Sequence, residues 1–181
     1  MTGQLIGVVG ASGVGKDSVM RALAEARPGF GLVRRVITRP GDAGGEAFDS
    51  VGEAEFVRRR AAGDFVLHWQ AHGLYYGIPV QVRHDLAQGR TCLVNLSRSV
   101  LARAEAQFSD FVTLHLTAPT AVLAQRLAAR GRESAAAIEA RLSRADYALP
   151  AGLGRVVHVA NDGPLDQTVT QILAALQPER A

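Results

Sequence analysis

The sequence predicts an α/β fold in which helices flank a parallel five-stranded core sheet. Two observations support this prediction: short apolar, β-rich runs alternate with helical patterns, and a glycine-rich loop joins the first run to the first helix. The alternation favours parallel strands, because a parallel pair needs a long crossover connection that a helix commonly supplies. With 181 residues the chain has the length of one domain with ample core, and we find no internal repeats.

The expected strands are the apolar runs Leu5–Val9, Val33–Thr38, Phe65–Trp69, Thr91–Leu96, Phe111–Leu116 and Val156–Ala160. Helices are expected from Lys16 to the Pro28-Gly29 stop, and over Glu53–Ala62, Pro79–Gln88, Ser99–Gln107, Thr120–Arg130, Ser134–Ala145 and Pro164–Leu176. Ser50 and Glu53 have the spacing of a capping box, which predicts the start of the second helix.

A glycine-rich loop follows the first expected strand. It matches the G-x-x-x-x-G-K pattern of nucleotide phosphate-binding loops over Gly10, Ala11, Ser12, Gly13, Val14, Gly15 and Lys16, and Asp17 and Ser18 continue it. A strand, a glycine loop and a helix N-terminus together bind anions, because free N–H groups and the helix dipole point at the phosphates. We therefore expect these nine residues to bind a nucleoside triphosphate.

Lys16 is the only lysine in a chain whose other nineteen basic residues are arginines. A compact ammonium fits inside a small loop of backbone amides, where a planar guanidinium does not. We expect Lys16 to hold the β and γ phosphates and to act in catalysis.

Asp17 stands where phosphate-binding loops usually have a Ser or Thr that binds Mg²⁺. Two interpretations stay open: Asp17 binds Mg²⁺ directly or through water, or it is a favourable carboxylate in the first helical turn. The metal role is slightly favoured, because an unneutralised carboxylate beside a triphosphate would be repelled. Ser18 would face about 100° further round the helix.

Composition excludes several classes of partner. The net charge is only +3, which is too small to indicate nucleic acid without a clustered basic stripe, and the run Arg58–Arg60 falls on an expected helix as a solvated face. No apolar stretch approaches membrane-spanning length and nothing resembles a signal peptide, so a cytoplasmic location is expected. Cys92 is the single cysteine, which excludes an intramolecular disulfide and indicates a buried thiol.

Two segments interrupt the regular alternation and divide the single domain, residues 1–181, into parts. Residues 34–82 are rich in Gly, Arg and aromatic residues and form an expected insert; residues 126–145 form an expected lid of two helices; residues 1–33, 83–125 and 146–181 form the core. A lid with arginines is suited to close over phosphates. This role is favoured for Arg130 and Arg141, whereas Arg126 and Arg144 are equally well explained as surface residues.

The ordered motifs resemble those of guanylate-kinase-like P-loop kinases over nearly the whole chain. They are GASGVGKDS from Gly10, ITR at 37–39, GLYYG at 73–77, RLAARGRE at 126–133, IEARLSRA at 138–145 and NDG at 161–163. Within this group the chain is most similar to the ribose 1,5-bisphosphate phosphokinases of phosphonate catabolism. The markers are GKDS, the WQAH that precedes GLYYG, and LVNLSR at 93–98.

This resemblance implies that ATP and Mg²⁺ are used to convert ribose 1,5-bisphosphate, a small phosphorylated sugar, into 5-phosphoribosyl 1-diphosphate. It implies that Arg130 and Arg141 close on the transferred group and that Asn161 lies on the adenine side. Arg39 and Tyr76 match the residues that grip an acceptor phosphate. A bisphosphate needs a second cation, for which Arg35 is favoured over Arg34 and Arg83, because Arg35 and Arg39 share a strand face.

The positions that read guanine in guanylate kinases differ here. They hold Phe48, Leu67 (or His68, given a one-residue ambiguity) and Pro79. Without a carboxylate the N–H donors of guanine would be buried unpaired, at a cost of ~1–3 kcal/mol each. The pattern therefore predicts that phosphate recognition is kept and base recognition is lost. The alternatives are a guanylate kinase with an altered pocket, a kinase for another sugar phosphate, or a non-catalytic binding module.

Overall fold

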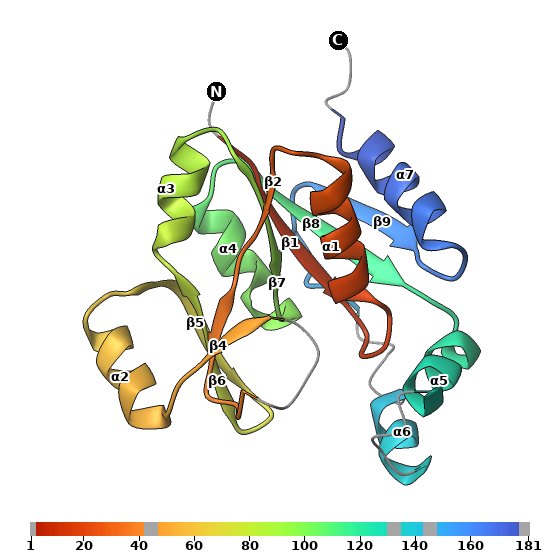
Figure 1. Ribbon diagram of the computed structural model, residues 1–181, viewed down its shortest axis with the longest axis horizontal. Coiled ribbons are helices and arrows are strands. Elements are labelled where there is room, and N and C mark those ends of the chain that lie inside the picture. The colour runs from red at the N-terminus through yellow and green to blue at the C-terminus, as the bar shows by residue number, and fades with distance from the viewer. Residues whose placement is uncertain (1–2, 42–46, 130–134, 143–147, 178–181) are drawn as a thin grey trace.

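The computed structural model describes residues 3–41, 47–129, 135–142 and 148–177. Its centre is a sheet of five parallel strands (Figure 1). In spatial order these are β2 (Phe30–Leu32), β7 (Thr91–Asn95), β1 (Leu5–Gly10), β8 (Phe111–Thr117) and β9 (Val156–Ala160). The predicted parallel five-stranded core is confirmed.

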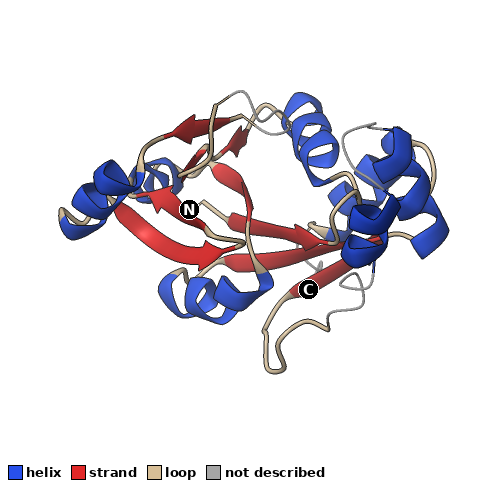
Figure 2. Ribbon diagram, turned by 90° about the horizontal axis from the view of Figure 1, so that it is seen from below, coloured by secondary structure: helices blue, strands red, loops and turns tan. Residues whose placement is uncertain are grey.

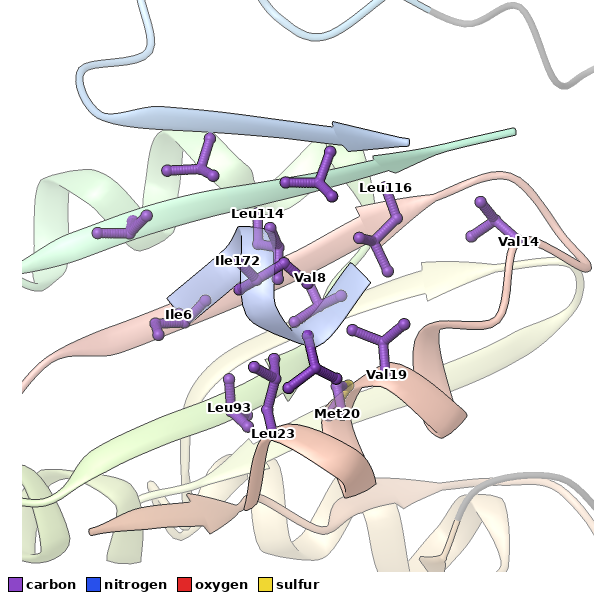
Figure 3. Close-up of a cluster of buried hydrophobic side chains, with 14 of the residues drawn as sticks. Ile6, Val8, Val14, Val19, Met20, Leu23, Leu93, Leu114, Leu116 and Ile172 are labelled. Atoms are coloured by element: carbon purple, nitrogen blue, oxygen red, sulfur yellow. The ribbon is translucent and has the colours of Figure 1, made fainter. Parts of the chain in front are cut away.

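Helices cover both faces of this sheet (Figure 2). One face carries α1 (Lys16–Ala26) and α7 (Leu165–Ala175); the other carries α3 (Gln81–Ala87), the 3₁₀ turn η1 (Arg98–Val100) and α4 (Leu101–Gln107). Side chains alternate along β1, so that Ile6 and Val8 pack toward α1 and α7 (Figure 3) while Leu5 and Val9 pack the other way. Burial on both faces explains why the strands are continuous apolar runs.

A second, four-stranded sheet is built within the expected insert. Its order is β4 (Phe48–Ser50), β3 (Arg35–Ile37), β6 (Leu74–Pro79) and β5 (Phe65–Ala71). The helix α2 (Glu53–Ala61) covers one face, where Phe56 stacks on Phe65 and Tyr75. The opposite face packs toward the central sheet, since Leu67, Trp69 and Ile78 belong to the same buried cluster as Leu5 and Val9.

Three local predictions in this insert are wrong. The helix expected over Pro79–Gln88 begins only at Gln81. Pro79 is instead the last residue of the strand β6, which pairs with both β3 and β5. Ser50 is in β4, where its hydroxyl donates to the carbonyl of Arg39 at 2.6 Å; α2 begins after Gly52 with no side-chain cap. The run expected as one strand over 33–38 forms a strand only at Arg35–Ile37.

The helices α5 (Thr120–Ala129) and α6 (Ala135–Leu142) pack against each other and project beyond the carboxyl end of β8 (Figure 1). The expected lid, residues 126–145, includes the end of α5 and all of α6. Arg130 and Arg144 lie outside the described residues, and the structure places Arg141 in α6 by its backbone. Among the described residues, no helix combines the length and apolarity needed to cross a bilayer.

A pair of histidines joins the two strands at one side of the central sheet. His115 of β8 is in register with His158 of β9, and their Nδ1 atoms are 3.2 Å apart. Burial lowers the pKa of His115 below its ordinary value of 6.5, and the nearby His158 and Arg98 lower it further. The folded protein therefore favours neutral His115.

We expect this pair to make stability depend on pH. The unfolded chain takes up a proton at His115 at a higher pH than the folded chain does, so the free energy of unfolding falls as the pH drops below about 6.5 and is retained above it. Urea unfolding between pH 7.5 and 5 measures the slope, which His115→Gln should reduce. His84→Gln, an exposed histidine on α3, is the control; an equal reduction by both variants contradicts the assignment.

Candidate active site

The loop between β1 and α1 has the backbone shape that its glycines permit. Gly13 and Gly15 have φ values of 86° and 95°, which side chains with a Cβ rarely adopt. A Cβ on Gly15 would also lie 2.7 Å from Nδ2 of Asn161. Close packing and positive φ together explain why glycine is required at this position.

The ammonium of Lys16 lies over the loop that contains it. Its Nζ donates to the carbonyls of Gly10 and Ala11, at 3.0 and 3.2 Å. The charge is thus held at the carboxyl end of the central strand, where ligands bind in open parallel sheets. This position supports the expected contact of Lys16 with phosphates.

The carbonyl of Val14 holds the outer turn of the loop. It accepts hydrogen bonds from Asn161 Nδ2 at 2.7 Å and from Arg126 Nη1 at 3.3 Å. Asn161 is only 5% exposed, and its Oδ1 accepts from the hydroxyl of Thr168 at 2.9 Å. Asn161, expected on the adenine side, therefore supports the loop itself, and Arg126 links the loop to α5.

Sequence reasoning did not identify Thr168. Its hydroxyl lies in α7, seven residues from Asn161, and the only local signal is the short NDG turn between β9 and α7. A threonine in an amphipathic helix is an ordinary residue, and only the packing of α7 against the sheet brings it to the amide of Asn161.

The carboxylate of Asp17 is suited to bind a cation near the loop. Its Oδ1 is buried and has no hydrogen-bond partner among the described groups, whereas Ser18 is exposed. An unsatisfied buried carboxylate oxygen is costly, and a hard cation such as Mg²⁺ prefers this kind of ligand. No group of three or more metal-ligating side chains occurs in the described part of the chain. The Oδ1 atom of Asp17, which has no partner among the described residues, therefore fits a Mg²⁺ ion, which Asp17 would hold as one protein ligand.

The second sheet brings Arg35 and Tyr76 together, as expected for acceptor-binding residues. The guanidinium carbon of Arg35 is 5.2 Å from the centroid of the Tyr76 ring and 5.9 Å from that of Trp69. The Trp69 and Tyr76 rings are stacked, with centroids 5.2 Å apart and planes at 5°. The sequence motif WQAH before GLYYG includes Trp69, but it did not predict that the Trp69 ring contacts Arg35 and Tyr76.

The other candidate arginines take separate positions. Arg39 packs over the ring of Phe48 at 4.2 Å, just after Thr38 has paired with β6. Arg34 forms an ion pair with Asp49 at 2.8 Å. Arg83 packs over Phe108, close to the amino ends of β1 and β8. Of the three arginines considered as a second cation, Arg35 is the one that packs beside Tyr76.

The residues at the positions expected to correspond to the base-reading residues of guanylate kinases are mostly apolar. Leu67 is buried, and Pro79 ends β6. The backbone carbonyl of His68 accepts a hydrogen bond from Arg103 at 2.6 Å. Burial, together with Arg103 and Arg60, lowers the pKa of the His68 imidazole. His72 has a φ of 52° in the tight turn between β5 and β6.

Comparison with known proteins identifies the family. A family model described as an AAA domain matches residues 6–145. A ribose 1,5-bisphosphate phosphokinase from Ruegeria sp. (strain TM1040) is 52% identical, over 99% of this chain and 94% of the relative. The corresponding protein from Pseudomonas paraeruginosa (strain DSM 24068 / PA7) is 48% identical, over 100% of this chain and 99% of its own. The chain belongs to the ribose 1,5-bisphosphate phosphokinase family.

The resemblance predicted from the motifs is thus confirmed. Among solved structures, a guanylate kinase from Anaplasma phagocytophilum matches with a TM-score of 0.64 and 18% identity, over 97% of this chain and 88% of the other. At that identity the match shows a shared fold. This chain therefore has a guanylate-kinase-like fold.

The support of the loop through Asn161 can be tested from α7. Thr168→Val removes the donor to Asn161 Oδ1 and leaves a buried acceptor unsatisfied, which should cost ~1–3 kcal/mol of stability. Because Asn161 then holds the Val14 carbonyl less firmly, ATP should also bind about tenfold more weakly. Urea unfolding and ATP titration measure both effects.

Thr170→Val is a matched control two residues along the same helix, because the Thr170 hydroxyl is exposed and donates only within α7. Its stability and ATP affinity should remain close to those of the wild type. Equal ATP affinity in the two variants would show that Thr168 does not act on the loop.

Proposed function

We propose that this protein transfers the γ-phosphoryl group of ATP to the 1-phosphate of ribose 1,5-bisphosphate, giving 5-phosphoribosyl 1-diphosphate and ADP. The observation that carries this proposal is the contrast across the site. The phosphate-binding loop and Lys16 are intact. The acceptor side has Arg39 and Tyr76 at the expected phosphate-gripping positions and Arg35 beside Tyr76, but it has Leu67 or His68 where a base-reading carboxylate is expected.

The chemistry requires no general base. An oxygen of the 1-phosphate is already ionised at neutral pH; it forms a bond to the γ phosphorus while the bond from that phosphorus to the β–γ bridging oxygen breaks. The difficulty is to bring two anions together, so catalysis consists mainly of positioning and charge neutralisation.

The residues of the chain divide this task. Lys16 and the N–H groups at the start of α1 hold the β and γ phosphates, and Arg35, Arg39 and Tyr76 hold the acceptor phosphates. Arg130 and Arg141 close on the transferred group. Asp17 would hold Mg²⁺, which would supply positive charge to offset the negative charge of the triphosphate.

The substrates also indicate which partners and which cellular location the reaction requires. Both are small phosphorylated molecules, and the modest net charge of +3 gives no basis for nucleic acid as a partner. We place the reaction in the cytoplasm, where ATP is available and a single cysteine remains reduced. Burial raises the pKa of the Cys92 thiol to about 11, which suits an unreactive core residue.

The acceptor can be tested directly by ³¹P NMR of the purified protein with Mg-ATP, with ribose 1,5-bisphosphate and GMP offered in separate tubes. We expect a new diphosphate pair at the anomeric position of the sugar and no change in GMP, since guanine finds no carboxylate at Leu67. Lys16→Ala should abolish the signal within the detection limit, a loss of about 100-fold or more.

Formation of GDP instead would reject the proposal and identify a guanylate kinase with an altered pocket. If the wild-type protein phosphorylates neither acceptor and does not bind ATP, it is a non-catalytic module. ATP binding without turnover of either acceptor would point to another sugar phosphate.

The role of Asp17 predicts a change in Mg²⁺ dependence. Asp17→Ala should raise the Mg²⁺ concentration for half-maximal activity by roughly 10–100-fold, whereas Asp17→Ser, which introduces the residue usual at this position, should restore most of it. Ser18→Ala is the control, because Ser18 is exposed. An unchanged Mg²⁺ requirement in Asp17→Ala would leave only the helix-terminus role.

A further inference from the structure

Trp69 lies at the centre of the face that the second sheet turns toward the core. It pairs across β5 and β6 with Tyr76, which pairs across β6 and β3 with Ile37. Directly paired residues project from the same face, and so does Arg35, two positions from Ile37. Trp69, Tyr76 and Arg35 therefore meet on one side, opposite the stack of Phe56, Phe65 and Tyr75.

The contacts among these three side chains hold two of them in place. The planes of Trp69 and Tyr76 are at 5° to each other, so the indole packs flat against the phenol ring. The guanidinium of Arg35 lies within 6 Å of both ring centroids, the range of cation–π attraction. Stacking engages the face of a guanidinium, whereas its N–H donors point outward in its plane, where they bind phosphate oxygens in pairs.

Trp69 also connects this face to the nucleotide side. It is 8% exposed and belongs to the buried cluster that includes Val9 and Leu96. Val9 directly precedes Gly10, the first residue of the phosphate-binding loop. The indole thus contacts Arg35 and Tyr76 and belongs to the same buried cluster as the strand that leads into the loop.

We propose that Trp69 is a positioning residue for phosphoryl transfer, which holds Arg35 and Tyr76 in the orientation that grips an acceptor phosphate. This inference rests on the proposed function for its acceptor. A buried aromatic residue of this sheet need not have such a role. Phe65 is about as buried as Trp69, but its ring stacks on Phe56 on the opposite face of the sheet.

Steady-state kinetics of Trp69→Leu and Trp69→Phe test the proposal. Trp69→Leu should raise KM for ribose 1,5-bisphosphate about tenfold or more while KM for ATP changes less than about twofold. Trp69→Phe, which keeps a ring, should recover most of the loss. Phe65→Leu is the matched control: it removes a ring from the opposite face and should lower stability without a selective rise in acceptor KM.

A double-mutant cycle separates positioning from general damage. Arg35→Met should raise acceptor KM strongly in the wild type and much less in Trp69→Leu, because the indole acts through Arg35. Additive effects, or an equal acceptor defect in Phe65→Leu, would overturn the proposal.

Fluorescence gives a readout that does not depend on turnover. Trp69 is the single tryptophan of the chain, so its emission reports on this site alone. We expect a saturable change on titration with ribose 1,5-bisphosphate without ATP, and a weaker affinity in Arg35→Met. No change at concentrations that saturate the kinetics would overturn the proposal.

The two inferences fail in different ways. If the wild type does not phosphorylate ribose 1,5-bisphosphate, the proposed function fails; titration with ribose 5-phosphate then decides about Trp69. A saturable, Arg35-dependent change of emission would uphold phosphate gripping by this group, and no change would reject it.

Discussion

The phosphate-binding loop has to present its backbone N–H groups to a ligand, so its shape has to be maintained from the protein side. The structure meets this constraint through the loop carbonyls. Asn161 and Arg126 both donate to the carbonyl of Val14, and Lys16 donates to the carbonyls of Gly10 and Ala11. The three donors come from different elements: Asn161 follows β9, Arg126 lies in α5 and Lys16 begins α1. Together their hydrogen bonds stabilise the shape of a single loop.

The same constraint explains how the outer parts of the molecule relate to the centre. Transfer between two anions requires both to be held in line, so the acceptor side needs a firm connection to the nucleotide side. One buried cluster joins Leu67 and Trp69 of the second sheet to Leu5 and Val9 of β1. On the other side, Arg126 ties α5, and with it the packed pair α5–α6, to the loop.

The predictions that succeeded depend on short stretches of sequence. A central parallel strand is buried on both faces and is therefore a continuous apolar run, as in β1 and β8. The strand β6 was missed because Leu74–Pro79 contains a glycine and a proline, which are rare in strands, and its extended form depends on pairing with β3 and β5. The capping box at Ser50 failed for a related reason, since pairing of β4 with β3 competes with the helix start.

The sequence alone was enough to predict the nucleotide loop with its lysine, four of the five core strands, the helices around them and the family of the chain; the core strand β2 was not predicted. Only the tertiary structure decided which separated side chains act together: Arg35 joins Tyr76 and Trp69, Arg34 pairs with Asp49, and Thr168 supports Asn161. The physical reason is range. A loop or a buried strand is specified by neighbours along the chain, whereas the meeting of side chains from different strands depends on sheet register and helix packing, which the whole fold sets.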